Sequence, residues 1–283
     1  MTETPIDSLV STSWLADQLG AEDLVLLDRT VFLEPVEGGF RAVSGESQFD
    51  DRHLPGARFA DLTGDLCDRD SPWRFAVPTP EQFASAMSRL GVSDACRVVL
   101  YDNNRMMWAA RVWWMLRWIG FDNAALLDGG QKAWEAEGRP TSDERPAPPA
   151  PGTLTPSPRP SLIADRDEVL AAIDDGAVCL IDALGEAQYR GEQNGYGRPG
   201  HIPGASNSPA MNLLDGDGHF RSEGQLSAMF DGNRSARTIT YCGGGIAASA
   251  DAFVMTRLGF TDVAVYTASL QEWAADETNP LTV

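Results

Sequence analysis

Long apolar runs, a secretory signal and paired cysteine motifs are all missing from this sequence, and each absence excludes a class of protein. No apolar segment of the 283 residues approaches the length of a membrane span, and the first residues lack a basic segment followed by an apolar one. The four cysteines lie far apart and no pair has CxxC spacing, so zinc and dithiol redox sites are not expected. These absences predict a cytoplasmic protein with free thiols, without a metal and without a membrane partner.

Positive charge is also scarce. The sequence has 22 Lys and Arg against 41 Asp and Glu, which gives a formal net charge of −19. A field of this sign repels nucleic acid and anionic membrane surfaces, so neither is expected as a partner. Because the field also disfavours long-range attraction of small anions, any anion site must be local and built from backbone amides and a few arginines.

One cysteine stands in a setting that the others lack. An apolar, β-branched run ends at Cys242, the glycines Gly243, Gly244 and Gly245 follow, and a helix-like segment begins at Ile246. Such a cysteine lies at the carboxyl end of a strand, beneath converging N–H groups and the positive end of a helix, and both favour a thiolate. The pattern predicts a reactive thiolate that handles an anionic or anion-generating substrate.

The other cysteines are interpreted as structural. Cys179 falls inside a strand pattern and Cys96 just before one, while Cys67 could be an exposed thiol. For Cys242 the structural alternative is a small buried hydrophobe at a strand end. The adjacent glycines and the duplication described next favour the catalytic interpretation.

The chain contains an internal duplication. A proline-rich stretch, residues 141–160, has no helical or strand periodicity and predicts an extended, semi-rigid linker between residues 1–140 and 161–283. Each half carries a His-Leu/Ile-Pro-Gly-Ala motif, at His53 and at His201. We therefore expect two copies of one unit rather than a repeat array.

Matching strand ends recur in the same order in both copies. One buried-strand pattern ends at Asp28 and at Asp182, and the next ends at Asp102 and at Cys242. Short apolar runs alternate with amphipathic segments, which predicts an α/β fold with a mostly parallel sheet and helices on both faces. Function in such sheets collects at the carboxyl ends of strands, where Asp102 and Cys242 both fall.

Together, the tandem copies, the repeated His-containing turn and a cysteine loop in the second copy alone resemble the two-domain rhodanese sulfurtransferases. The segment Ala-Ala-Arg-Val-Trp-Trp-Met-Leu-Arg at 109–117, with Leu-Asp-Gly-Gly at 127–130 and Trp134, is similar to the first-domain signature of that family. The resemblance covers nearly the whole chain. It implies two tandem rhodanese-like domains, the first catalytically silent because Asp102 occupies the cysteine position.

The resemblance also implies a ping-pong reaction without a metal or an organic cofactor. The Cys242 thiolate would take a sulfane sulfur from a small anionic donor, thiosulfate or 3-mercaptopyruvate, and the resulting persulfide would pass it to cyanide or a thiol. Glycine suits the loop because it lets the backbone wrap closely around the sulfur. The implied substrate-binding residues of this loop are Gly243, Gly244, Gly245, Ile246 and Ala247.

Two departures from the family pattern concern the donor. The loop is uncharged, whereas thiosulfate-type members carry basic residues there, and Gly244 stands where mercaptopyruvate-type members have serine. Leu184 and Gln188 stand where both types commonly place arginines, and neither side chain can bind a sulfonate or carboxylate in the bidentate manner of arginine. Arg190 and Arg198, which lie nearby in the sequence, are predicted to take the place of these arginines.

Other residues have both a functional and a structural interpretation. The shared turn motif favours a structural role for His201, while His53 keeps a catalytic alternative because mercaptopyruvate-type members have been assigned one at that position. Arg29, Phe32 and Arg105 are expected near a cleft between the domains.

Two further functions stay open. A sulfur carrier fed by a partner protein, and delivering to a sulfur-accepting protein, would explain the missing arginines. A cysteine phosphatase is related by fold, but it would need a longer loop and an arginine that clamps phosphate.

Overall fold

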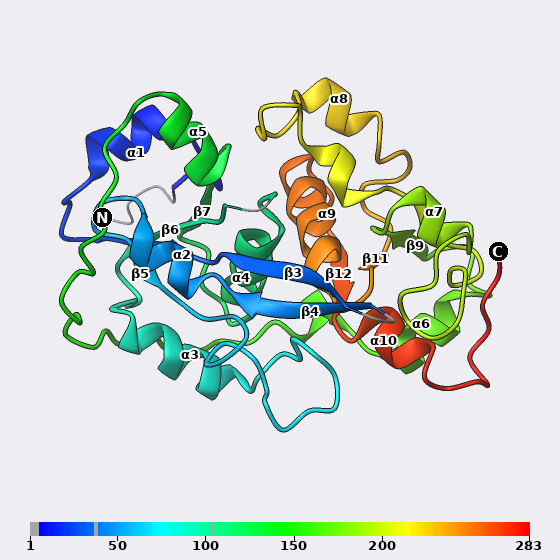
Figure 1. Ribbon diagram of the computed structural model, residues 1–283. Coiled ribbons are helices and arrows are strands. Elements are labelled where there is room, and N and C mark those ends of the chain that lie inside the picture. Colours follow the sequence, from blue (N-terminus) through cyan, green and yellow to red (C-terminus); the bar gives the residue numbers. More distant parts are fainter. Residues whose placement is uncertain (1–5, 37–38, 104) are drawn as a thin grey trace.

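The computed structural model describes residues 6–36, 39–103 and 105–283, with one parallel sheet in each half of the molecule (Figure 1). The first sheet has the spatial order β1-β7-β6-β2-β5, and each adjacent pair of strands is parallel. Its strands are β1 Leu9–Val10, β2 Leu24–Asp28, β5 Arg58–Phe59, β6 Arg97–Tyr101 and β7 Ala124–Leu127.

The second sheet repeats this topology with later strands. Its order is β8-β12-β11-β9-β10, again with parallel neighbours only, so each strand has a counterpart at the same place in the first sheet. The strands are β8 Ile163–Ala164, β9 Cys179–Asp182, β10 Ser206–Asn207, β11 Thr238–Tyr241 and β12 Val263–Tyr266. The matching order confirms the predicted duplication and the α/β fold class.

Helices follow the strands as the sequence pattern predicts, and side chains cap several of them. Thr79 and Gln82 form a capping box at the start of α3, and the Asp165 carboxylate caps α6. In the first half the helices are α1 Thr12–Gln18, α2 Glu46–Asp51, α3 Pro80–Arg89, α4 Met107–Trp118 and α5 Gly130–Ala136. In the second half they are η1 Pro160–Leu162, α6 Arg166–Ala172, α7 Glu186–Tyr189, η2 Ala210–Leu213, α8 Glu223–Ser227, α9 Ile246–Arg257 and α10 Ser269–Trp273. Within the described residues, none of these helices combines the length and apolar character that crossing a bilayer requires.

Both faces of the first sheet are covered. Along β6, Val98 and Leu100 pack in one apolar cluster with α3 and α4, whereas Val99 and Tyr101 pack in another with α1, α2 and α5. This alternation follows from the period of two in a strand, which turns successive side chains to opposite faces.

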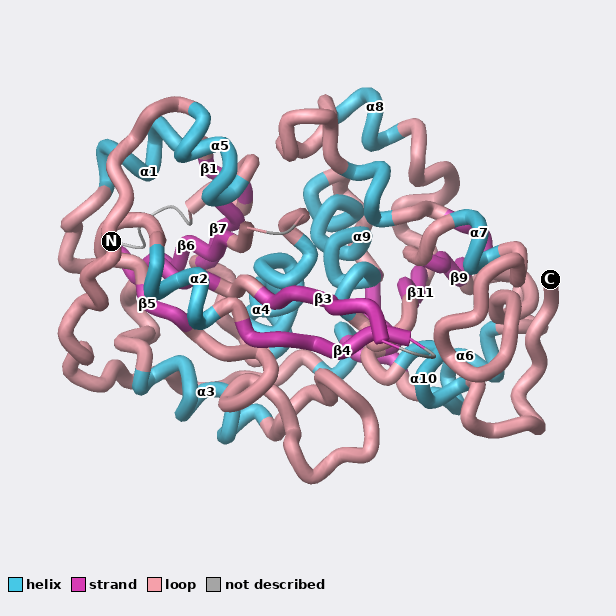
Figure 2. Tube along the Cα trace, in the orientation of Figure 1, coloured by secondary structure: helices cyan, strands magenta, loops and turns pink. Residues whose placement is uncertain are grey.

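The two halves meet along α4 and α9, which lie side by side at the centre of the molecule (Figure 2). Trp113 of α4 meets Phe253 of α9 edge to face, with ring centroids 4.8 Å apart. One apolar cluster runs through this contact into both halves. The helices that follow β6 and β11 thus bring the carboxyl ends of the two sheets toward each other.

The first half has an insertion that the second half lacks at the same place. Strands β3 Val31–Val36 and β4 Gly39–Ser44 pair antiparallel after β2, and the hairpin reaches across the front of the molecule toward α10 (Figure 1). In the second half, α7, the counterpart of α2, follows β9 with no hairpin between them.

The proline-rich stretch is held along the first half. Gly152 donates its N–H to the Ser88 carbonyl at 2.8 Å, and Ser157 donates to the Ile119 carbonyl at 2.7 Å. The linker predicted at residues 141–160 therefore lies against α3 and the end of α4 instead of spacing the halves apart.

Candidate active site

Cys242 follows β11 directly, and its side chain is 2 % exposed. The Gly245 N–H, at the start of α9, donates to the Cys242 Sγ at 3.1 Å. The Cys242 N–H donates to the Ser269 hydroxyl at 3.1 Å, and that hydroxyl donates to the Tyr266 carbonyl at 2.6 Å. The sulfur therefore lies where the predicted N–H cradle and the positive helix end meet.

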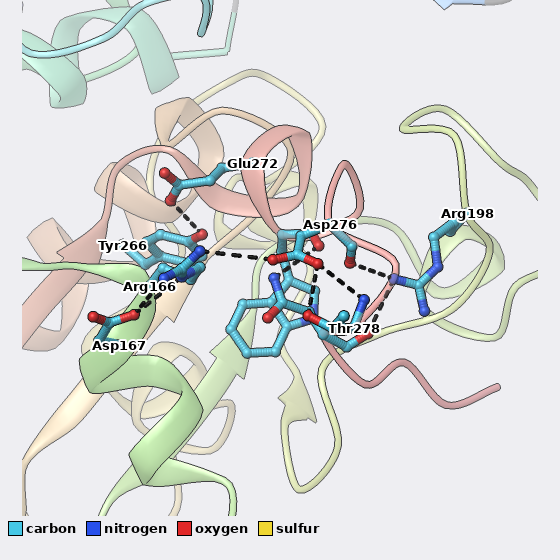
Figure 3. A network of polar contacts seen from close by, with 9 residues as sticks. Arg166, Asp167, Arg198, Tyr266, Glu272, Asp276 and Thr278 are labelled. Carbon is cyan, nitrogen blue, oxygen red and sulfur yellow. Dashed lines mark hydrogen bonds and ion pairs between the residues drawn. The ribbon is translucent and has the colours of Figure 1, made fainter.

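Helix α10 holds the loop from the other side. The N–H groups of Leu270 and Gln271 donate to the carbonyls of Cys242 and Gly243, each at 3.0 Å. A polar network fixes the chain after α10 (Figure 3): Asp276 accepts from the Thr278 N–H at 3.0 Å and pairs with Arg166 at 3.7 Å. The position of the cysteine loop is thereby coupled to α6 and α10.

Two of the three loop glycines are required by their surroundings. A Cβ at Gly243 would fall 1.7 Å from the Tyr196 hydroxyl oxygen. Gly245 has a φ of +79°, and a Cβ there would fall 2.6 Å from the Thr267 carbonyl oxygen. At Gly244 the nearest atom would be the flexible Gln271 Nε2, at 3.2 Å. Close approach of the backbone, rather than flexibility, explains the glycines at 243 and 245.

The first domain has the same cradle, already filled. One carboxylate oxygen of Asp102 accepts the Met106 N–H at 2.9 Å, and the other accepts the N–H groups of Trp108 and Ala109 at 3.1 and 2.9 Å. Met106 is the left-handed residue before α4, as Gly245 is before α9. An anion built into the chain therefore occupies this cradle.

The correspondence identifies the donors around the thiol. Met106 matches Gly245, which donates to the sulfur, and Trp108 and Ala109 match Ala247 and Ala248 of the second loop. The second oxygen of the Asp102 carboxylate accepts from Trp108 and Ala109. By analogy, an atom bonded to the Cys242 sulfur would meet the amides of Ala247 and Ala248 at the start of α9.

A cleft of about 500 Å³ opens beside the thiol, between the two halves. Gly243, Gly244, Ile246 and Ala247 line it with Cys242. Gly245 touches the sulfur through its N–H without lining the cleft. Most of the remaining wall is apolar and comes from both halves: Leu33, Phe40, Phe75, Met107, Trp108, Ala183, Leu184, Ala210 and Met211.

The charged groups of the cleft are arginines of the first half. Of the side chains that line it, Arg74 and Arg105 are cationic, and none is a carboxylate. Arg74 donates to the Phe40 carbonyl at 2.7 Å, and Arg105 lies 2.8 Å from the Met211 sulfur. Neither forms an ion pair within the part of the chain that the structure describes. In a chain of net charge −19, this cleft is locally suited to an anion.

Arg74 is fixed across the domain boundary. The Gln271 carboxamide accepts the Arg74 backbone N–H at 3.1 Å and donates to the Arg74 carbonyl at 2.9 Å. Arg74 precedes Phe75 in a long loop of the first half that has no recognisable motif, so sequence reasoning missed it. Arg74 could have been predicted only by knowing which loop of the first half lies over the second sheet.

The arginines predicted to replace the family pair do not reach the cleft. Arg190 is exposed and pairs with Glu186 and Glu192 at 3.1 and 2.9 Å, while Arg198 donates to the carbonyls of Asp276 and Asn279. Contrary to the prediction, Arg190 does not line the cleft, because carboxylates of its own segment hold it at the surface.

The positions that lost the family arginines do line the cleft, as Leu184 and Gln188. Arg105 lies there as predicted, but Arg29 is buried and donates to the Ala60 carbonyl instead. Phe32 is replaced at the cleft wall by its neighbour Leu33.

The two histidines hold equivalent turns. The Nδ1 atom of His53 lies 2.6 Å from the Phe49 carbonyl oxygen, and its ring stacks on Phe49. His201 repeats both contacts with Tyr189, at 2.8 Å. Neither histidine lines the cleft, so the geometry favours the structural interpretation for both.

The remaining thiols differ from expectation in one respect. Cys179 is exposed because it begins β9, Cys67 is partly buried, and Cys96 is buried. Burial raises the pKa of the Cys67 and Cys96 thiols. The accessible thiol is therefore Cys179, not Cys67.

Comparison with known proteins agrees with this architecture. Residues 11–137 and 165–276 each match the family model of the rhodanese-like domain. The chain is 33% identical to a probable 3-mercaptopyruvate sulfurtransferase of Pseudomonas aeruginosa, over 96% of this chain and 97% of the relative. It is 34% identical to the thiosulfate sulfurtransferase of Cricetulus griseus, over 94% of this chain and 91% of the relative.

A solved structure gives the same result. SseA of Escherichia coli, described as a 3-mercaptopyruvate sulfotransferase, superimposes with a TM-score of 0.83 at 27% identity, covering 93% of this chain and 99% of that one. Family match, identity and fold extend over both halves. The chain therefore belongs to the rhodanese family, as a sulfurtransferase with two rhodanese-like domains in tandem.

Proposed function

We propose that this sulfurtransferase works through a persulfide on Cys242, with thiosulfate or 3-mercaptopyruvate as donor and cyanide or a thiol as acceptor. One observation carries the proposal: the buried Cys242 sulfur accepts the Gly245 N–H at 3.1 Å, in a cradle whose counterpart is filled by the Asp102 carboxylate. The relatives named for the two donors make these the first to test.

With thiosulfate, the Cys242 thiolate attacks the outer sulfur, the S–S bond breaks, and sulfite leaves with the bonding electrons. With 3-mercaptopyruvate, the C–S bond breaks, and the pyruvate enolate takes up the proton that the donor thiol brings. Either route leaves a persulfide anion on Cys242. Attack by cyanide on its outer sulfur then releases thiocyanate and restores the thiolate.

Backbone amides supply the electrostatic stabilisation. The persulfide moves negative charge one atom outward, and the amides of Ala247 and Ala248 match those that hold the second oxygen of Asp102. Such donors are preorganised and need no rearrangement when charge develops. The apolar cleft wall strengthens these interactions by excluding water.

Recognition of the donor is assigned to the first domain. Arg74 and Arg105 line the cleft, and they can meet a sulfonate or carboxylate that Leu184 and Gln188 cannot bind by charge. The silent half would thus provide the cations that the second half has lost.

A partner-fed sulfur carrier is the second candidate. Leu33 and Phe40 are each 47 % exposed and Met211 43 % at the cleft, and a protein partner could bury them. In that case the persulfide would arrive from another protein and pass to a sulfur-accepting protein, with little turnover of free donors.

Intact mass spectrometry after exposure to each donor tests the proposal. The expected result is a gain of one sulfur from at least one donor, lost in Cys242→Ser and kept in Cys179→Ser, which removes the accessible thiol instead. A gain that survives in Cys242→Ser would reject the assignment of Cys242. No gain from either donor in the native chain would favour the carrier.

A further inference from the structure

Arg111 is a fully buried arginine at the junction of the two domains. It belongs to α4 of the silent domain, and its side chain has no exposed surface. One guanidinium nitrogen lies 3.4 Å from the Gly245 carbonyl oxygen, and another donates to the Phe75 carbonyl at 3.0 Å. The guanidinium thus joins the start of α9 to a loop of the first domain.

These hydrogen bonds leave the charge of Arg111 without a carboxylate. Both acceptors are neutral carbonyls, and within the described residues its Nε has no hydrogen-bond partner and its guanidinium no ion pair. An unpaired buried cation costs several kcal/mol, so a compensating anion is expected nearby.

The anion available is the sulfur of Cys242. Burial lowers the pKa of Arg111 to about 10, and the one charged group that acts on it in the opposite direction is Cys242. The geometry is consistent with this, because Gly245 donates its N–H to the sulfur and accepts the Arg111 guanidinium at its carbonyl. The Ser249 hydroxyl shares that carbonyl at 2.7 Å.

We propose that Arg111 is a positioning residue, the buried cation with which the first domain balances a negative charge on the Cys242 sulfur and holds its loop. The thiolate part of this proposal does not depend on sulfur transfer. That Arg111 also balances the charge of a persulfide anion on Cys242 rests on the proposed function.

Two substitutions separate charge from hydrogen bonding. Arg111→Gln keeps hydrogen-bond donors and removes the charge, whereas Arg111→Lys keeps the charge and removes the planar fork. The measurement is the rate at which iodoacetamide alkylates Cys242 in the full chain, followed by mass spectrometry from pH 5 to pH 10. Because removal of a buried opposite charge destabilises an anion beside it, alkylation at neutral pH should slow about tenfold or more in Arg111→Gln.

The lysine variant should react at close to the native rate. A glutamine variant that folds and alkylates with the native profile would overturn the proposal. This readout needs no sulfur donor, so it is independent of whether the proposed function holds.

Arg29→Gln is the matched control. Arg29 is also a fully buried arginine of the first domain, but its charge faces Asp28 and it lies away from the cleft. This variant should lower the unfolding temperature without moving the alkylation profile. An equal shift in Arg29→Gln would mean that the effect is general loosening, and it would also overturn the proposal.

A comparison without any substitution covers the case in which Arg111→Gln does not fold. Native chain alkylated by iodoacetate carries an anionic adduct on Cys242, and chain alkylated by iodoacetamide carries a neutral adduct of nearly the same shape. The anionic adduct should give the higher unfolding temperature. Equal temperatures, or the reverse order, would count against a buried cation that requires an anion.

Discussion

Arg105 and Arg190 show how local partners decide what an arginine can do. Arg190 is held by two carboxylates of its own segment, whereas Arg105 has a methionine sulfur as its contact and lines the cleft beside the thiol. A guanidinium without a carboxylate keeps its charge available to an incoming anion.

We therefore expect Arg105→Gln to slow alkylation of Cys242 by iodoacetate more than by iodoacetamide, because only the first reagent is an anion. The ratio of the two rates should fall about fivefold, equivalent to ~1 kcal/mol for one partly exposed charge. Arg190→Gln, which removes an equally cationic but distant side chain, should leave the ratio unchanged. An equal fall in both variants would show that net charge, not the cleft, governs the rate.

At the scale of elements, the β3–β4 hairpin distinguishes the two halves. It lies between β2 and α2, where the second half passes directly from β9 to α7, and it carries Leu33 and Phe40 to the cleft wall. An apolar wall contributes binding energy to substrates that carry an apolar group and contributes little to a small inorganic anion. We therefore expect the hairpin to favour donors that carry an apolar group.

Phe40→Ala should lower kcat/KM for an aryl thiosulfonate about fivefold, since ~1 kcal/mol of apolar contact would be lost, and should change kcat/KM for thiosulfate much less. Val36→Ala is the control, because Val36 lies on the same hairpin with the same 47 % exposure as Phe40 and does not line the cleft. If kcat/KM falls equally for both donors in Phe40→Ala, the hairpin acts on the cysteine loop and not on the choice of substrate.

At the scale of the whole molecule, buried carboxyl groups contribute to the pH response of stability. Asp251 on α9 has no exposed surface, and its two carboxylate oxygens have no hydrogen-bond partner within the described chain. Burial raises its pKa well above the usual value, and burial raises that of Asp182 to about 6. The folded chain then keeps protons that the unfolded chain releases near pH 4, so the contribution of these two groups to stability declines as pH rises above 4.

Asp251→Ala should remove part of this decline. Relative to the native chain, the variant should gain ~1 to 3 kcal/mol at pH 8, the cost of an unsatisfied buried polar group, and should gain less at pH 5. Urea unfolding at the two pH values measures the difference. A gain that is the same at both would mean that Asp251 does not titrate with folding.

The sequence was sufficient for features that repeat or that depend on neighbours along the chain. The strands ending at Asp28 and Asp182 revealed the duplication, and the glycines after Cys242 identified the loop. Close approach of backbone to Tyr196 and Thr267 explains why this signal is strong, since other residues would not fit at Gly243 and Gly245.

Contacts between domains were not predictable in the same way. Arg74 reaches the cleft because Gln271, 197 residues later, holds its backbone, and no pattern in either segment announces that contact. The prediction for Arg190 was wrong because closeness in sequence to Leu184 and Gln188 does not tell where a side chain points. The Arg190 side chain points to Glu186 and Glu192 instead of the cleft.

The filled cradle of Asp102 has a consequence for the two copies of the fold. The Asp102 carboxylate satisfies its amides at all times, whereas the amides around Cys242 meet a full anion only when the sulfur is charged. One copy carries a fixed anion, and under the mechanism proposed above the other gains and loses the outer sulfur of its anion in every cycle. Duplication would then have produced a permanent and a renewable version of one binding site in a single molecule.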